Sequence, residues 1–209
     1  GLEDILKNMD EEKRDRIINS AIDEFAKYPY AKASTNNIVE NAGISKGLLF
    51  HYFGNKKDLY EKLSRFVLNK LSDEIMANID WDQTDILERI KQLAIFKMKL
   101  GEKYPTMFEF IIKILAEKKT QSIESVIELY EEYGVDIQKL LGDVYARNID
   151  FSMFRDQASI DKSLNIIRWT LEKYAEEMLV QVSSLDKRDY EKIGSDMDVY
   201  IDVLRKAFY

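Results

Sequence analysis

The chain has 209 residues and a formal net charge of −7, with 45% apolar and 33% charged residues. This composition is typical of a globular protein and argues against a disordered chain. The length allows one domain or two. No cysteine is present, which excludes disulfides and thiolate metal sites, and no apolar run approaches the ~20 residues that span a bilayer, so we expect a cytoplasmic protein without a membrane partner.

The first predicted element is a helix that begins after Asp10. This residue is a suitable N-cap, and acidic residues follow it in the first turn. Pro29 ends the helix, because proline disfavours the helical conformation in the residue before it. Between these two points one apolar stripe has helical spacing: Ile17, Ile18, Ala21, Ile22 and Phe25.

Two short helices and one long helix follow. The second helix covers 34–42 and the third covers 45–53, each with a serine as its cap. Gly43 stands between them as a left-handed stop residue. A fourth helix covers about 56–79. Two short helices joined by a tight turn at glycine are typical of a helix-turn-helix.

The third helix has one inward and one outward face. Leu49 and Phe53 are four residues apart and can pack on the first two helices. Gly47 lacks a side chain, so the backbone there can approach a duplex closely. The outward group fits a major groove, and residues 26–63 hold six Lys or Arg against three Asp or Glu. This group consists of Lys46, Gly47, Leu48, His51 and Tyr52.

Each candidate also has a simpler interpretation. His51 could be a metal ligand, a general base or a solvated residue, but a metal site would need carboxylates alone around the only histidine. Lys46 and Lys56 could be ordinary surface lysines, yet both stand at helix starts, where free N–H groups also attract phosphate. Thr35 could be a neighbour of the cap or a phosphate contact. We predict no metal and eight DNA-contacting residues: Thr35, Ser45, Lys46, Gly47, Leu48, His51, Tyr52 and Lys56.

The rest of the chain has a helical period and no lasting strand-like alternation, so we predict an all-α fold. Gly134 and Gly142 interrupt the third of these helices, which we expect to bend or split there. The least periodic stretch, 147–159, is predicted to be a connection. The expected helices are 84–103, 106–117, 121–146, 159–183 and 187–208, with Thr84, Asp161 and Asp186 as candidate caps.

Large rings and methionines are dense between residues 96 and 182. Burial in a helical core explains most of them, but the same density suits a pocket for a small apolar or amphipathic molecule. Paired carboxylates occur too, at helical spacing beside lysines as on solvated faces, so we predict neither an enzyme nor a cofactor. The candidate pocket residues are Phe96, Phe108, Tyr130, Tyr133 and Trp169.

The last two predicted helices each have an apolar stripe that exceeds what one core requires. We therefore expect a homodimer closed by these helices. The stripes are Ile160, Leu164, Ile167, Leu171 and Met178 on one helix, and Ile193, Met197, Tyr200 and Leu204 on the other.

At its N-terminal third the sequence resembles the TetR/AcrR family of bacterial transcriptional regulators. The resemblance rests on Ser34-Thr35, on the run from Ile38 to Phe53, and on Lys56 and Leu59. Three residues depart from the family pattern. Phe50 replaces the usual tyrosine and lacks its hydroxyl, and Tyr52 replaces the usual histidine and keeps a hydrogen-bond donor. Pro29 occupies a position where the family often has glycine.

The resemblance implies a three-helix DNA-binding domain over 1–55, a connecting helix over 56–80, and a helical effector-binding and dimerisation domain over 81–209. It implies a homodimeric repressor that binds double-stranded DNA at a palindromic operator and is released by a small molecule. The alternative is a DNA-binding protein whose C-terminal domain docks a protein partner. A large exposed apolar patch favours docking, and an enclosed cavity favours an effector.

Overall fold

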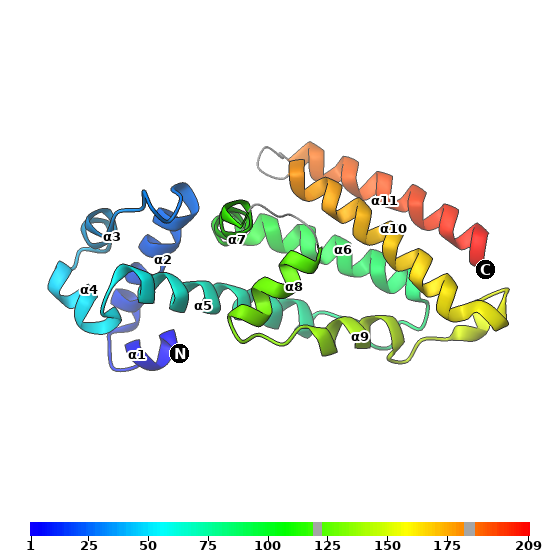
Figure 1. Cartoon of the computed structure of the whole chain (residues 1–209), viewed down its shortest axis with the longest axis horizontal. Helices are drawn as coiled ribbons and strands as arrows, with labels where there is room; N and C mark the ends of the chain where they lie inside the picture. The colour runs from blue at the N-terminus through cyan, green and yellow to red at the C-terminus, as the bar shows by residue number, and fades with distance from the viewer. Residues whose placement is uncertain (119–122, 182–186) are drawn as a thin grey trace. The chain divides into compact units, whose positions relative to one another are not determined.

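A computed structural model describes residues 1–118, 123–181 and 187–209, and within these ranges it contains helices and no strand (Figure 1). The predicted all-α fold is confirmed. The chain divides into two compact units. The first unit comprises Gly1–Leu71, Tyr104–Thr120 and Glu128–Val135, and the second comprises Ser72–Lys103, Gln121–Ile127 and Asp136–Tyr209. Both units are therefore discontinuous in sequence, unlike the three consecutive segments expected from the sequence.

The first unit begins with helices close to those predicted. They are α1 (Leu2–Leu6), α2 (Glu11–Lys27), α3 (Thr35–Ala42), α4 (Lys46–Phe53) and α5 (Lys56–Ala77), the last of which extends into the second unit. The side chain of Asp10 accepts a hydrogen bond from the N–H of Lys13 at 3.2 Å, as expected of a cap. Tyr28 is extended, so α2 ends before Pro29. Only α1 was not predicted from the sequence.

Helix α7 (Pro105–Glu117) belongs to the first unit because it packs against α2. Phe110 of α7 joins a ring cluster with Phe25, Tyr30 and Tyr60, and its centroid lies 6.1 Å from Phe25 and 5.6 Å from Tyr60. The carboxylate of Glu117 also accepts the N–H of Tyr30 at 2.7 Å. These contacts explain why the first unit includes more of the chain than the predicted segment 1–55.

The second unit contains α6 (Ile86–Lys103), α9 (Gln138–Ala146), η1 (Phe151–Met153), η2 (Gln157–Ser159), α10 (Ile160–Gln181) and α11 (Lys187–Phe208). Helix α8 (Ile123–Glu132) is shared between the units. The predicted helix 121–146 splits at Gly134, whose φ of 72° places it in the left-handed region. Gly142 lies inside α9 and does not break it.

Two of the predicted caps are corrected. Helix α6 begins at Ile86, so Asp85 and not Thr84 directly precedes it. The side chain of Asp85 accepts the N–H of Leu87 at 3.0 Å. Asp161 lies inside the first turn of α10, because η2 leads directly into that helix. The third predicted cap, Asp186, lies outside the described residues.

The predicted interface stripes are also corrected. Ile167, Leu171 and Leu204 are buried in the core of their own chain. This core is formed by α6, α10, α11 and the loop at Phe154. Both long helices carry a second apolar face that remains exposed. We call it the α10–α11 outer face, and it consists of Ile166, Trp169, Val199, Tyr200 and Val203.

The end of the chain is held to the start of α6 by a polar cluster. Arg205 donates to Asp85 at 2.7 Å and to Glu88 at 2.9 Å, and the hydroxyl of Tyr209 donates to Asp85 at 2.6 Å. Burial by itself raises the pKa of Asp85, but the hydrogen bonds from Tyr209 and Arg205 outweigh it and leave that pKa below its ordinary value.

This cluster predicts how stability depends on acid. A carboxylate with a depressed pKa stabilises the folded state above its unfolded pKa of about 3.9, and this contribution is lost as the pH falls through the folded pKa. Asp85→Asn should therefore be less stable than the native chain at pH 7, and the difference should shrink below about pH 4. Urea unfolding at several pH values measures this, and a difference that stays constant into acid would contradict it.

Candidate nucleic-acid interface

The turn between α3 and α4 is set by one glycine. Gly43 has φ 65° and ψ 37°, a left-handed conformation that glycine adopts without steric cost. The N–H of Ile44 donates to the carbonyl of Val39 at 3.0 Å, which closes the end of α3. Arg16 of α2 donates its Nε–H to the carbonyl of Ala42 at 3.3 Å. The two short helices are thus fixed to each other and to α2.

A buried acid fixes the start of α3. Glu24 lies on the inner side of α2 and accepts the N–H of Ser34 at 2.8 Å and the amide of Asn37 at 3.3 Å. The hydroxyl of Ser34 accepts the N–H of Asn37 at 3.3 Å. Hydrogen bonds to a charged acceptor are about twice as strong as neutral ones, so Glu24 orients the loop that leads into the helix-turn-helix.

The inward face of α4 is anchored as predicted. Leu49 and Phe53 are 1% and 2% exposed. The hydroxyl of Ser45 accepts the N–H of Leu48 at 3.1 Å, so this residue acts as the N-cap of α4. Thr35 is the first residue of α3 and is half-buried.

The opposite side of α4 is open. Lys46, Gly47 and His51 are exposed, and Leu48 and Tyr52 are half-buried. The rings of His51 and Tyr52 meet edge to face, with centroids 5.3 Å apart. The five residues predicted to form the outward group therefore retain accessible surface on one short, capped helix.

Aromatic rings position the two candidate lysines. The ammonium of Lys56, the first residue of α5, lies 4.6 Å from the centroid of Tyr30. The ammonium of Lys46, the first residue of α4, lies 5.8 Å from that of Phe50. A cation held over a ring is attracted by about 0.5–1 kcal/mol at an exposed site, which favours one side-chain position without neutralising the charge.

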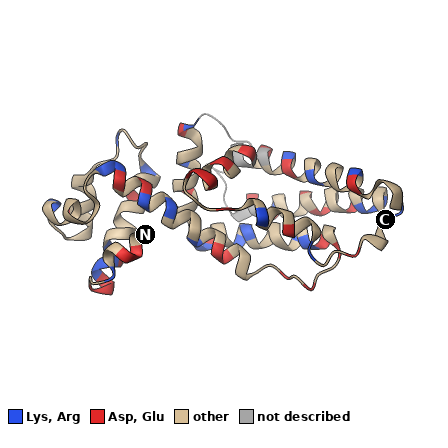
Figure 2. Ribbon diagram, turned by 60° about the horizontal axis from the view of Figure 1, so that its bottom comes forward, with Lys and Arg blue, Asp and Glu red and all other residues tan. Residues whose placement is uncertain are grey.

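Charge alone does not mark this surface. Basic and acidic residues are mixed over much of the ribbon in Figure 2. The excess of six Lys or Arg over three Asp or Glu is confined to residues 26–63. Since exposed charges are screened within about 10 Å at 0.1 M salt, a local excess is the relevant quantity for phosphate contacts.

Two positioning residues were missed in the sequence, Glu24 and Tyr30. Glu24 falls within the apolar stripe of α2, between Ala21 and Phe25, and an acid at such a position indicates a buried hydrogen-bonding role. Tyr30 lies beside Pro29 in a loop, where periodicity gives no signal. Its contact with Lys56 depends on the fold of the first unit.

The residues predicted to line an effector pocket belong to different units. Phe108, Tyr130 and Tyr133 lie in the first unit, and Phe96 and Trp169 lie in the second. Burial raises the pKa of Tyr130 to about 12, so its hydroxyl remains a neutral donor. Trp169 is 58% exposed and lies on the α10–α11 outer face. It therefore does not line an enclosed cavity of a single chain.

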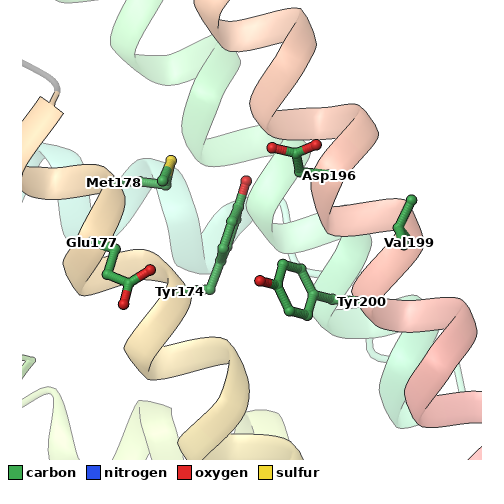
Figure 3. Close-up of a pocket in the computed structure, with 6 residues that line it drawn as sticks. All are labelled: Tyr174, Glu177, Met178, Asp196, Val199 and Tyr200. Carbon is green, nitrogen blue, oxygen red and sulfur yellow. The ribbon is translucent and has the colours of Figure 1, made fainter.

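One pocket of about 390 Å³ opens between α10 and α11 (Figure 3). The rings of Tyr174 and Tyr200 lie side by side in it, with centroids 5.0 Å apart. Its full lining is Tyr174, Glu177, Met178, Asp196, Val199 and Tyr200. None of the five predicted pocket residues takes part. Across the described residues, no three His, Cys, Asp or Glu side chains could hold a metal ion, and no helix could cross a membrane.

Comparison with known proteins finds similarity in the N-terminal part of the chain. Residues 17–63 match the model of the bacterial regulatory proteins of the tetR family. The HTH-type transcriptional regulator BetI 2 of Chromohalobacter salexigens is 34% identical over 65 residues, which is 31% of each chain. IcaR of Staphylococcus aureus, an HTH-type negative transcriptional regulator of the biofilm operon icaADBC, is 27% identical over 95 residues. That match covers 46% of this chain and 51% of IcaR, so the similarity spans about half or less of these relatives.

Solved structures extend the likeness to the whole fold. A TetR family transcriptional regulator from Chloroflexus aurantiacus superposes with a TM-score of 0.60 over 98% of this chain and 97% of its own, at 19% identity. A transcriptional regulator from Rhodococcus sp. RHA1 gives 0.64 over 93% and 96%, at 15% identity. At such low identity these neighbours establish the fold alone, including the helical C-terminal part.

Proposed function

We propose that this protein is a transcriptional repressor of the TetR family that acts in the cytoplasm and binds a palindromic operator as a homodimer. The observation that carries this proposal is the exposed side of α4, next to a turn fixed by Gly43. Negative regulation is the printed role of the relative IcaR, and it agrees with this proposal. The proposed function requires no catalytic residue.

Helix α4 is of suitable size to enter a major groove. Leu48, His51 and Tyr52 would face base edges, and Gly47 would allow a close backbone approach. Lys46, Lys56, Thr35 and the capped helix starts would contact phosphates, which fix the register but carry no sequence information. The role of Ser45 is to hold the start of α4.

The α10–α11 outer face supports assembly into a dimer. Five large apolar side chains are exposed there, and each is between 42% and 62% accessible. Contiguous exposed apolar surface marks an interaction site, and large aromatic residues at its centre usually contribute most to binding. A second copy offers the same face, as a two-fold interface requires. Two copies of α4 could then meet successive major grooves.

Trp169→Glu should disrupt this dimer and DNA binding together. A carboxylate buried in an apolar interface is destabilising, so we expect the dissociation constant of the dimer to rise by roughly 30-fold or more, in line with a central interface residue. Sedimentation at several concentrations measures assembly, and fluorescence anisotropy with duplex DNA measures binding. Met76→Glu is the control, since Met76 is also half exposed but lies on α5.

If the native protein is a stable monomer at micromolar concentration, the proposed dimer and the binding of two successive major grooves are both contradicted. The outer face would then favour docking of a different protein, the alternative function. An unchanged dimer in Trp169→Glu would place the interface elsewhere.

A small-molecule effector completes the proposed function. Binding in the second unit would favour a dimer whose two α4 helices are wrongly spaced for DNA. Effector and operator must then weaken each other reciprocally, typically by about 1–3 kcal/mol, or roughly 5- to 150-fold. The apolar and aromatic residues that keep some accessible surface in the second unit, Phe96 among them, support such a site.

A further inference from the structure

The pocket between α10 and α11 is built from one face of each helix. The three residues from α10 and the three from α11 both have the spacing i, i+3 and i+4, which places side chains on one side of a helix. Each set contains one tyrosine, one carboxylate and one apolar side chain. The sets are Tyr174, Glu177 and Met178 from α10, and Asp196, Val199 and Tyr200 from α11.

Two tyrosine rings form the aromatic part of this pocket. Tyr174 is 6% exposed, and its hydroxyl donates to the carbonyl of Ile193 at 3.1 Å, which fixes the ring against α11. Tyr200 is 42% exposed, and the centroid of its ring lies 5.0 Å from that of Tyr174. The face of an aromatic ring attracts a cation that lies within about 6 Å of the ring centroid. One ring is therefore held in place, and the other is open to a ligand.

Both charged residues that line the pocket are acidic. Glu177 and Asp196 are exposed, and neither forms a hydrogen bond or an ion pair within the part of the chain that the structure describes. By contrast, Asp198 on the same helix α11 pairs with Lys91 at 2.9 Å. Figure 3 shows the two carboxylates of the pocket on either side of the Tyr174 ring. No described residue thus neutralises the negative charge of the pocket.

The size and the charge of the pocket suit a small cation. Its volume of about 390 Å³ falls within the range of roughly 300–1,000 Å³ that is usual for small-molecule sites. Burial, and next the charge of Asp196, raises the pKa of Tyr174. The carboxylate therefore disfavours a second negative charge in the pocket, and an anionic ligand would meet the same repulsion.

We propose that this pocket binds a small organic cation, in which an ammonium group is attached to an apolar body. The ammonium would lie over the ring of Tyr200, within reach of Glu177 and Asp196, and the apolar body would contact Met178 and Val199. A metal ion fits less well, because no three metal-binding side chains come together among the described residues. The inference concerns ligand binding alone, so it can fail while the proposed operator binding stands.

Direct binding of matched probes to the full chain tests the charge preference. Isothermal titration calorimetry at a fixed salt concentration compares octyltrimethylammonium and octylammonium with octanol and octanoate, which have the same tail. Attraction to an open ring and to two carboxylates should make at least one cation bind roughly tenfold more tightly than octanol. The quaternary cation cannot donate hydrogen bonds, so the two cations distinguish recognition by the ring from recognition by the carboxylates. If neither cation binds more tightly than octanol, or if octanoate binds as tightly as the cations, the inference is overturned.

Paired substitutions locate the preference. Glu177→Gln with Asp196→Asn keeps both side-chain shapes and removes both charges, so it should reduce the preference for cations at least threefold and leave octanol binding unchanged. Glu191→Gln with Asp202→Asn is the control, since it removes two charges from exposed positions of α11 outside the pocket. This control should keep the full preference. A preference that survives in the first variant, or an equal loss in both variants, would exclude this pocket as the site.

A second copy of the chain is the alternative occupant, because Val199 and Tyr200 also belong to the α10–α11 outer face. Trp169→Gln changes that face outside the pocket lining, and it should weaken the proposed dimer without adding charge. The inference predicts the same preference for cations in the native chain and in this variant. A preference that is found only in the variant would show that the partner fills the pocket of the native protein, which contradicts the inference.

Discussion

Replacing Lys46 and Lys56 together by alanine is expected to weaken operator binding by roughly 10²- to 10³-fold at 0.15 M salt. Each lysine stands at a helix start beside a ring that limits its position. A dimer would lose about four phosphate contacts, and the slope of log affinity against log salt should become shallower by about 3.6. Fluorescence anisotropy over a range of salt concentrations measures both quantities.

The control for this experiment must change net charge equally. Lys99→Ala with Lys162→Ala removes the same two charges from exposed positions on α6 and α10. This variant should lower affinity only slightly, because its charges lie outside the helix-turn-helix. An unchanged salt slope in the Lys46 and Lys56 variant, or an equal loss in the control, would contradict the docking through α4.

Loss of Arg89 is expected to have the largest effect on stability. Arg89 is 1% exposed, and its guanidinium donates to the carbonyls of Gln83 at 2.6 Å and Arg147 at 2.5 Å. It also reaches the carbonyls of Trp81 and Val144, both at 3.2 Å. One side chain thus donates to backbone carbonyls of the loop before α6, of α9 and of the residue that caps α9. None of these partners is charged, and burial lowers the pKa of Arg89.

Arg89→Met would remove a donor from the buried carbonyl of Val144 and from three part-buried carbonyls, so we expect a loss of roughly 3–5 kcal/mol in the free energy of unfolding. For a chain of this size that corresponds to a fall in Tm of roughly 10 °C. Thermal and urea unfolding measure it. Arg147→Met is the control, because Arg147 also stacks on Trp81, at 4.5 Å, but is exposed. Equal losses in the two variants would show that the buried hydrogen bonds of Arg89 contribute little.

The helix-turn-helix could be predicted from the sequence because its signals are local. The caps Ser34 and Ser45 and the stop residue Gly43 act within a few residues of themselves, and the structure reproduces the predicted ends of α3 and α4. The short α1 was missed since five residues cannot show a helical stripe. The split at Gly134 was expected, but Gly142 looked equivalent in sequence and proved compatible with a helix.

The second unit was harder because its helices have more than one apolar face. Periodicity shows that a face is apolar but not which neighbour covers it. Ile167 and Leu171 were assigned to a partner and lie in their own core, whereas Trp169 was assigned to a pocket and is exposed.

The central claim is that two α4 helices read an inverted repeat in duplex DNA. Selection of the native protein against a pool of random-sequence duplexes tests it most directly, since it requires no knowledge of the operator. The account predicts enrichment of an inverted repeat whose half-sites lie about one helical turn, or a multiple of it, apart. Enrichment should disappear in the Lys46 and Lys56 variant. Recovery of no common sequence by the native protein, at a salt concentration where it binds DNA, would contradict the claim.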